Sequence, residues 1–263
     1  MKYSILLFLL LPLLTFSQQT INQTDSRGLK QGYWQKKYPS GTLMYEGYFT
    51  DGKPTGHWKR YHESGRVKAI LQYSEKGDSV KALLFENSEE PVAEGSYVGE
   101  KKEGLWIYFS GKIKIAEERF SGGLKNGQCR KYYNSGELLE ESEWKNNQLE
   151  GKYSAYFQSG KPYLQCMYSQ NRRNGRCFSY FQSGNPEVES FYQNDLPEGT
   201  WKYFDDEGNL RYTLIYEKGL LKNPEVLLEL DSDELDSLEK QRDRFAYPEK
   251  YLQNPEEYFN RNR

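Results

Sequence analysis

The sequence has few of the residues on which metal sites depend. Its 263 residues include 3 cysteines and 2 histidines. The cysteines form no C-x-x-C pair and lie far along the chain from the histidines, whereas a metal site needs several such ligands close together. These residues are Cys129, Cys166 and Cys177, with His57 and His62. We therefore expect no metal and no cofactor.

The chain also lacks an excess of charge of one sign. It has 36 Lys and Arg residues against 38 Asp and Glu residues, which gives a formal net charge of -2. Nucleic acids and anionic membranes attract proteins mainly through an excess of positive charge. We expect no nucleic-acid partner, and net charge does not indicate which other partner the protein binds.

Long apolar runs are absent except at the start of the chain. Ile5 to Leu14 is apolar apart from Pro12, and Thr15 and Ser17 follow with small side chains at the -3 and -1 positions of a cleavage site. The run is shorter than the roughly 20 residues of a membrane-spanning helix. Residues 1–17 are predicted to be a signal peptide cleaved after Ser17, so the mature protein is expected to be secreted or periplasmic, with no transmembrane segment. The alternative is an N-terminal core helix or an uncleaved anchor.

No constellation typical of catalysis is present. The two histidines lie in one predicted hairpin without a matching serine or cysteine, which nucleophilic catalysis would need beside a base. Glu140, Glu141 and Glu143 cluster, but catalytic acids need a cleft that separates their pKa values. The glycines do not form a phosphate-binding loop. We predict no catalytic residues and no enzymatic activity.

Aromatic residues and glycines are abundant instead. The chain has 23 Tyr and 23 Gly, and aromatic residues make up 16% of it. Aromatic side chains favour strands, and glycine favours tight turns. The composition therefore predicts β-structure.

The glycines reveal a repeat of 24 residues. A leading glycine is followed nine residues later by another one in six places, and a degenerate unit begins at Val80. The unit at Gly104 is one residue short in its central turn, where a loop tolerates a deletion. The eight units begin at residues 32, 56, 80, 104, 127, 151, 175 and 199.

Aromatic residues recur at fixed positions of each unit. All five tryptophans lie either two or seventeen residues after the leading position. A third column, five residues after the leading position, contains Tyr61, Phe85, Phe109, Tyr132, Tyr156, Tyr180 and Phe204. The second half of each unit alternates between apolar and polar residues, as in Val67, Ala69, Leu71 and Tyr73, and a Ser-Gly turn precedes it. Each unit is therefore predicted to be a β-hairpin.

The repeat resembles the MORN repeat, specifically its bacterial variant. The best matches are Gly32 to Gly41 (GYWQKKYPSG) and Gly56 to Gly65 (GHWKRYHESG). The resemblance implies an all-β repeat protein, an elongated antiparallel meander of about eight hairpins over residues 32–222. It also implies a scaffold for protein contacts, or an antitoxin-like protein.

The regions outside the repeats have their own predictions. Residues 18–31 are expected to be a linker, and residues 223–263 a helical C-terminal tail or cap. Asp231 and Glu234 could cap a helix that runs to about Ala246. The tail either covers the last strand edge, as repeat arrays require, or docks a partner.

The predicted function is an exported, non-enzymatic scaffold that binds a protein or a component of the cell envelope. The alternative is an antitoxin-like or immunity protein that neutralises a toxin. The candidate interaction surface is the aromatic column from Tyr61 to Phe204, which could bind a peptide or glycan by stacking or could simply stabilise the sheet. Cys166 and Cys177 could face each other across a turn and form a disulfide.

Overall fold

A computed structural model describes residues 20–86, 88–230, 235, 236 and 239. These residues contain twenty strands and one short helix, and every strand pairing is antiparallel. This confirms the predicted all-β meander. The chain divides into two compact units, residues 1–112 (unit 1) and residues 113–263 (unit 2), and each is described separately.

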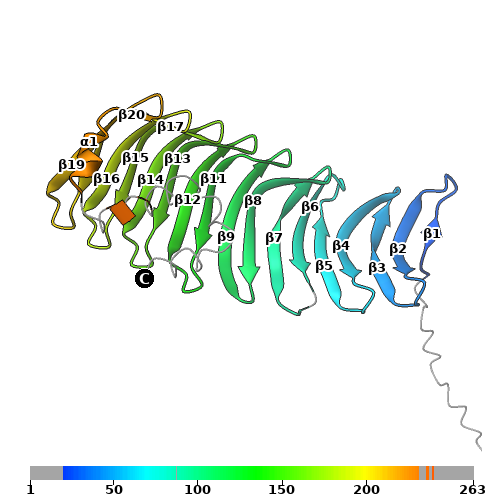
Figure 1. The fold of residues 1–263 in the computed structure, drawn as a ribbon. Helices are drawn as coiled ribbons and strands as arrows, with labels where there is room; N and C mark the ends of the chain where they lie inside the picture. Colours follow the sequence, from blue (N-terminus) through cyan, green and yellow to red (C-terminus); the bar gives the residue numbers. More distant parts are fainter. Residues whose placement is uncertain (1–19, 87, 231–234, 237–238, 240–263) are drawn as a thin grey trace, which may run out of the picture. The chain divides into compact units, whose positions relative to one another are not determined.

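Unit 1 is a meander in which each strand pairs with the next, and Figure 1 shows these strands side by side in chain order. Its strands are β1 (Gln23–Thr24), β2 (Lys30–Lys37), β3 (Leu43–Thr50), β4 (Lys53–Tyr61), β5 (Val67–Tyr73), β6 (Ser79–Phe85), β7 (Pro91–Val98) and β8 (Lys101–Ser110).

Unit 2 repeats the arrangement, with short strands β10, β17 and β20 where the chain enters or leaves a hairpin. Its elements are β9 (Ile113–Ser121), β10 (Leu124–Lys125), β11 (Gly127–Tyr132), β12 (Leu138–Lys145), β13 (Gln148–Tyr156), β14 (Pro162–Ser169), β15 (Arg172–Tyr180), β16 (Pro186–Gln193), β17 (Leu196–Pro197), β18 (Gly199–Phe204), β19 (Leu210–Glu217), β20 (Leu220–Leu221) and α1 (Glu225–Leu228).

The Ser-Gly turns close the hairpins as the sequence predicts. In the second repeat the Gly65 amide donates to the carbonyl of His62 at 2.9 Å, and Gly65 has a φ of 86°. Glycine adopts this left-handed conformation without steric cost. The register shifts by one residue between Arg60 and Tyr61, so a bulge precedes the turn.

The turns at the other edge join one hairpin to the next. Asn146 and Asn147 both have positive φ, the conformation of a two-residue hairpin turn. The Asn147 carboxamide oxygen also accepts a hydrogen bond from the Lys125 amide, one repeat earlier, at 2.6 Å. Asn171 and Asp195 make the same contact with the preceding repeat at 2.7 and 2.8 Å. These side chains fix the register between neighbouring repeats along this edge.

One face of the sheet, called the inner face here, contains the core of each unit. In unit 1 it is formed by Trp58, Ala69, Leu71 and Ala82. The indole ring of Trp58 makes edge-to-face contacts with Phe49 and Tyr73, at centroid distances of 4.8 and 5.7 Å. These are the columns two and seventeen residues after the leading position, and such ring pairs stabilise a sheet that has no second layer.

The inner face of unit 2 uses the same two columns. Tyr192 contacts Trp201 at 5.0 Å, and Trp201 contacts Tyr216 at 4.9 Å. Cys177 and Val188 are fully buried in the same cluster. The indole N–H of Trp201 donates to the carbonyl of Phe191, so the buried polar atom of the ring is satisfied.

Large and small side chains alternate across neighbouring strands of the inner face. A Cβ atom added to Gly47 would overlap the indole ring of Trp58, and one added to Gly95 would overlap that of Trp106. At the equivalent place in unit 2, Cys166 pairs with Cys177 and the two form a disulfide with a Cα separation of 4.1 Å. The disulfide therefore occupies the position that a glycine and a tryptophan fill in unit 1.

The inner face becomes polar near the start of unit 2. Glu140 is 4% exposed, and the ammonium of Lys131 lies 3.3 Å from its carboxylate. Burial raises the pKa of Glu140 in spite of this contact. Cys129 takes the position of the tryptophan column, and burial raises the pKa of its free thiol.

The two ends of the array add to the predicted organisation. Strand β1 pairs with β2, so part of the segment expected to be a linker belongs to the sheet. Helix α1 packs Val226 and Leu227 against the core of unit 2, which confirms a short C-terminal helix, although it begins six residues before the predicted start at Asp231. The predicted signal peptide, and most of the helix predicted from Asp231 to about Ala246, lie outside the described residues.

Candidate binding surface

The opposite side of the sheet, the outer face, holds the column predicted as an interaction surface. Successive residues of a strand point to opposite sides, and the column five residues after each leading position lies opposite the tryptophans. Each of its seven members is half-buried, and each stands at the end of its strand or one residue before it. These residues are Tyr61, Phe85, Phe109, Tyr132, Tyr156, Tyr180 and Phe204.

Tyrosine hydroxyls of this column contact acidic or amide side chains of the preceding repeat. Tyr61 donates to the carboxylate of Glu46 at 2.5 Å, and Tyr33, which belongs to the same repeat as Glu46 and to another column, donates to this carboxylate at 2.5 Å as well. These hydrogen bonds lower the pKa of Glu46, and the bond from Tyr33 has the larger effect. Burial, followed by the hydrogen bond to Glu46, raises the pKa of Tyr61. Tyr180 donates to the amide oxygen of Gln165 at 3.0 Å.

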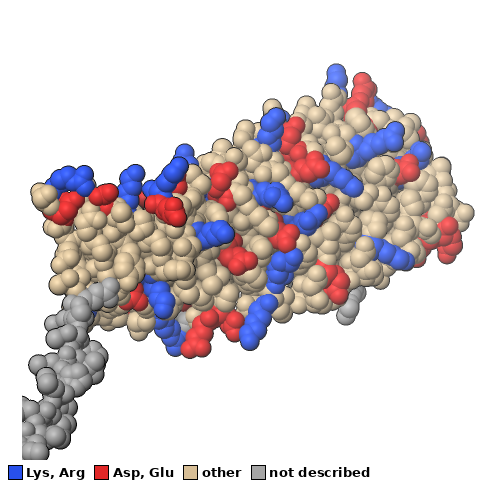
Figure 2. Space-filling view, turned by 180° about the vertical axis from the view of Figure 1, so that it is seen from behind, with Lys and Arg blue, Asp and Glu red and all other residues tan. Residues whose placement is uncertain are grey.

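In unit 2, basic side chains lie beside the aromatic column and the carboxylates next to it. The ammonium of Lys114 lies 4.3 Å from the ring centre of Tyr132 and 2.6 Å from the carboxylate of Glu117. Arg130 donates to Glu141 at 2.9 Å. Figure 2 shows basic and acidic side chains interspersed on the surface seen there. The polar groups described here find their partners within the sheet, which fits a structural role of the aromatic column. Ligand binding by this column remains a prediction.

The histidines and the glutamate cluster do not converge on a site. His62 lies 3.4 Å from the carbonyl oxygen of Phe85. Tyr133, at the same repeat position, donates to the carbonyl of Tyr156 at 2.8 Å. The imidazole of His62 therefore replaces a tyrosine hydroxyl that links neighbouring repeats. Glu140 points to the inner face and Glu141 to the outer one, since they are adjacent on β12.

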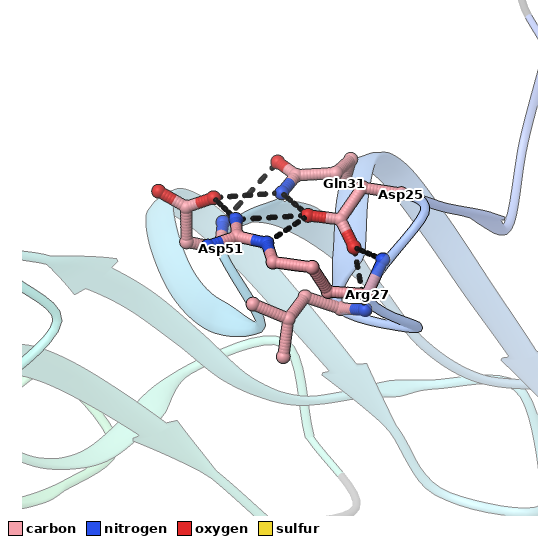
Figure 3. Close-up of polar contacts among 5 residues, drawn as sticks. Asp25, Arg27, Gln31 and Asp51 are labelled. Atoms are coloured by element: carbon pink, nitrogen blue, oxygen red, sulfur yellow. Dashed lines mark hydrogen bonds and ion pairs between the residues drawn. The ribbon is translucent and has the colours of Figure 1, made fainter.

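A polar cluster at the start of unit 1 also has a structural role (Figure 3). The Asp25 carboxylate accepts from the amides of Leu29 and Arg27, and the bond from Leu29 is the main reason that the pKa of Asp25 falls to about 2. The guanidinium of Arg27 bridges to Asp51 at 2.8 Å, and Gln31 donates to the same carboxylate at 2.9 Å. The cluster ties the first turn to the turn one repeat later.

A hollow of about 400 Å³ lies on the outer face of unit 1. Its apolar lining includes Ile70, Leu83, Leu105 and Ile107, with the exposed His57 at its rim. At the repeat position of Leu83 and Ile107 the other six units carry Gln35, Lys59, Arg130, Ser154, Phe178 and Lys202, of which only Phe178 is apolar. The sequence analysis did not predict this hollow. The signal that could have indicated it is the pair of apolar residues, Leu83 and Ile107, in a column that is polar in most other repeats.

Other site types find no support in the described part of the chain. Among its residues, no group of three or more His, Cys, Asp or Glu side chains is arranged to hold a metal ion. Nor does any helix found there combine the length and the apolar character needed to cross a bilayer.

Comparison with known families agrees with the geometry. The MORN repeat variant family matches residues 30–51, 54–75, 125–146, 173–194 and 197–218. The chain is a MORN repeat protein. The matched segments lie in both units, and the MORN hairpins continue through the segments between them, where β6, β7, β13 and β14 keep the same pairing. No curated protein matches the sequence.

The family assignment bears on function at a coarse level. MORN repeats form scaffolds that are generally not catalytic, which agrees with a protein-binding role.

Proposed function

We propose that this MORN repeat protein is an exported, non-enzymatic scaffold that binds another protein or a component of the cell envelope through the outer face of its sheet. The observation that carries the proposal is the apolar hollow of unit 1. Concave surface lined mainly by apolar side chains is typical of binding sites.

The fold itself does not require the hollow to be apolar. The core of unit 1 lies on the inner face, around Trp58 and Leu71. Lys59 and Gln35 occupy the repeat position of Leu83 in hairpins that form equally well. Polar residues would therefore serve the strand as well as Leu83 and Ile107 do, and a bound partner explains why apolar ones are present.

Export is supported by two independent features. Residues 1–17 have the composition of a cleaved signal peptide. The Cys166–Cys177 disulfide fits an oxidising compartment, where such bonds persist.

The first test is crosslinking of the tagged full-length protein in the cells that make it, followed by fractionation and mass spectrometry. The proposal expects a mature chain that begins at or near Gln18 and is crosslinked to an envelope or secreted protein. An unprocessed cytoplasmic chain crosslinked to one small toxic protein would contradict it and favour the antitoxin-like alternative.

A variant tests the hollow directly. Leu105 is 38% exposed, so Leu105→Glu should leave the melting temperature within a few degrees of the unchanged protein while abolishing capture of the partner. The matched control is Gln128→Glu, the same repeat position in unit 2 and outside the hollow, which should capture the partner normally. Equal capture by both variants would contradict a role of the hollow.

A further inference from the structure

Three consecutive repeats of unit 2 expose one apolar side chain each on the outer face. Met167 on β14, Phe191 on β16 and Ile215 on β19 are 43%, 41% and 44% exposed. The residues on either side of Phe191, Ser190 and Tyr192, are buried on the inner face. We call Met167, Phe191 and Ile215 the apolar stripe.

The stripe departs from the character of its column. All three residues stand sixteen positions after the leading residue of their repeat. The same column in the earlier repeats holds Tyr48, Gln72, Ser96 and Glu143, and in the unit that is one residue short it holds Arg119, fifteen positions after Gly104. Polar and charged residues are therefore compatible with the strand at this position. The change to apolar residues in the last three repeats has no explanation in the packing of the sheet.

Positively charged side chains lie next to the stripe. Lys152 is the cross-strand neighbour of Met167, and Arg176 is that of Phe191. Both are exposed, and within the described residues neither forms an ion pair. Lys202 by contrast bridges to Glu189 at 3.2 Å.

The spacing of the stripe selects the shape of its partner. Its residues lie on every second strand, which places them roughly 10 Å apart, twice the spacing of neighbouring strands. Two turns of an α-helix rise by about 10.5 Å over seven residues. An extended peptide would instead cover one repeat with about three residues and would present alternate sides.

We infer that the apolar stripe is the docking site of an acidic amphipathic α-helix of a partner protein. The helix lies across the strands, with one apolar residue about every seven positions on the stripe and carboxylates facing Lys152 and Arg176. This rests on the proposed function and names the partner's surface within it.

The test places a photo-crosslinking amino acid at position 191 of the full-length protein in the cells that make it. The matched control is position 48 of the same column, where Tyr48 is 45% exposed and is not among the residues that line the hollow of unit 1. The expected result is an adduct at 191 at least ten times stronger than at 48, mapped to a helical partner segment of net negative charge. Arg176→Glu should reduce the adduct at least tenfold, and Arg176→Lys should change it by less than threefold.

Several results would overturn the inference. They are an adduct with residues 231–263 of the same chain, with a second copy, or with a basic or extended segment, and an adduct that Arg176→Glu leaves unchanged. Both Arg176 variants are first checked for an unaltered melting temperature, so that loss of folding is not read as loss of binding.

A third crosslinking position separates this inference from the proposed function. Position 105 lies in the hollow of unit 1. A protein adduct at 105 with none at 191 overturns the helix site and leaves the scaffold proposal standing. Adducts at neither position overturn both.

Discussion

Gly47 and Gly95 show how single residues set the packing of the inner face. Each lies on the strand next to a tryptophan and leaves the space that the indole ring occupies. The ring then contacts aromatic residues on both sides, as Trp58 does with Phe49 and Tyr73. The absence of a side chain at Gly47 is thus as important to the core as the presence of Trp58.

Gly47→Ala is predicted to destabilise the protein by about 1–3 kcal/mol, the usual cost of overpacking a core. The added methyl group would overlap the ring of Trp58. The free energy of unfolding in urea, followed by tryptophan fluorescence, measures the effect. In a Trp58→Ala background the same substitution should cost close to nothing, and an equal cost in both backgrounds would contradict the packing argument.

Glu140 is predicted to reduce stability at neutral pH. Burial raises its pKa, so the folded state holds the proton more tightly than the unfolded chain does. The protonated carboxyl of Glu140 is therefore the form that favours folding. Its contribution to stability is fully present below the unfolded pKa of 4.5 and is lost as pH rises through the folded pKa. Glu140→Gln should therefore raise the melting temperature relative to the unchanged protein at pH 7, with a much smaller gain at pH 4.

Glu117 provides a control of opposite sign. The hydrogen bond from Lys114 is the main reason that its pKa is lowered, so its contribution is present above the unfolded value and is lost as pH falls through the folded pKa. Glu117→Gln should lower the melting temperature at pH 7 and matter less in acid. The same sign of change for both variants would contradict this account.

Residue-scale features were only partly predictable. The tryptophan columns follow directly from the 24-residue period. The glycine beneath each ring was not recognised, because Gly47 and Trp58 belong to different repeats and a comparison of columns within one repeat does not pair them. The charged residues Glu140 and Lys131 were visible in the sequence. The burial of the Glu140 side chain could not be predicted, because it depends on which face of its strand packs into the core.

At the scale of elements, the hairpins were predictable because period-two alternation and Ser-Gly turns recur in nearly every repeat. The degenerate unit at Val80 also forms a hairpin, since β6 and β7 pair over their whole length. The segment before Gly32 was expected to be a linker because it lacks the repeat signature. Its strand β1 has two residues and depends on β2 for its pairing, which no local pattern shows.

The disulfide between β14 and β15 is predicted to stabilise this pair of strands by about 3 kcal/mol, the entropic effect of closing a loop of this order. It joins residues separated by 11 positions. Replacing both cysteines by serine should lower the free energy of unfolding by that amount, and a reductant should have a similar effect on the unchanged protein alone. Mass spectrometry of the unreduced protein should find the Cys166–Cys177 link, with Cys129 free.

A transplant distinguishes packing from crosslinking at the same place. The double variant Cys166→Gly with Cys177→Trp recreates the glycine and tryptophan pair of unit 1. It should recover at least half of the stability that the serine variant loses. Stability no better than that of the serine variant would show that the two kinds of pair are not interchangeable.

At the scale of the whole molecule, stability is distributed over local contacts between successive strands, as in other repeat arrays. Each unit has its own buried cluster, one around Trp58 and one around Trp201. The sequence predicted this organisation from the repeat. It did not predict the hollow or the apolar stripe, because both depend on which columns share the outer face and which neighbours leave them exposed.

Helix α1 is predicted to protect the backbone amides at the end of unit 2 from hydrogen exchange, without affecting amides in unit 1. Helix α1 packs Val226 and Leu227 against the cluster that contains Leu214. Replacing both α1 residues by serine should increase hydrogen exchange of the β18 and β19 amides at least tenfold, because their opening requires only local unfolding. Amides of β4 and β5 serve as the internal control and should exchange as before, whereas faster exchange there would contradict local capping.

The pairing of Gly47 with Trp58 also determines which piece of the chain can be copied or removed as a module. The pair spans the junction of two sequence repeats, so a cut at the leading glycines would separate the ring from the space made for it. A cut at the Ser-Gly turns keeps them together, because Gly47 and Trp58 both lie between Gly41 and Gly65. The exchangeable module for lengthening, shortening or recombining the array is therefore the segment from one Ser-Gly turn to the next, which is offset from the sequence repeat by about half a period.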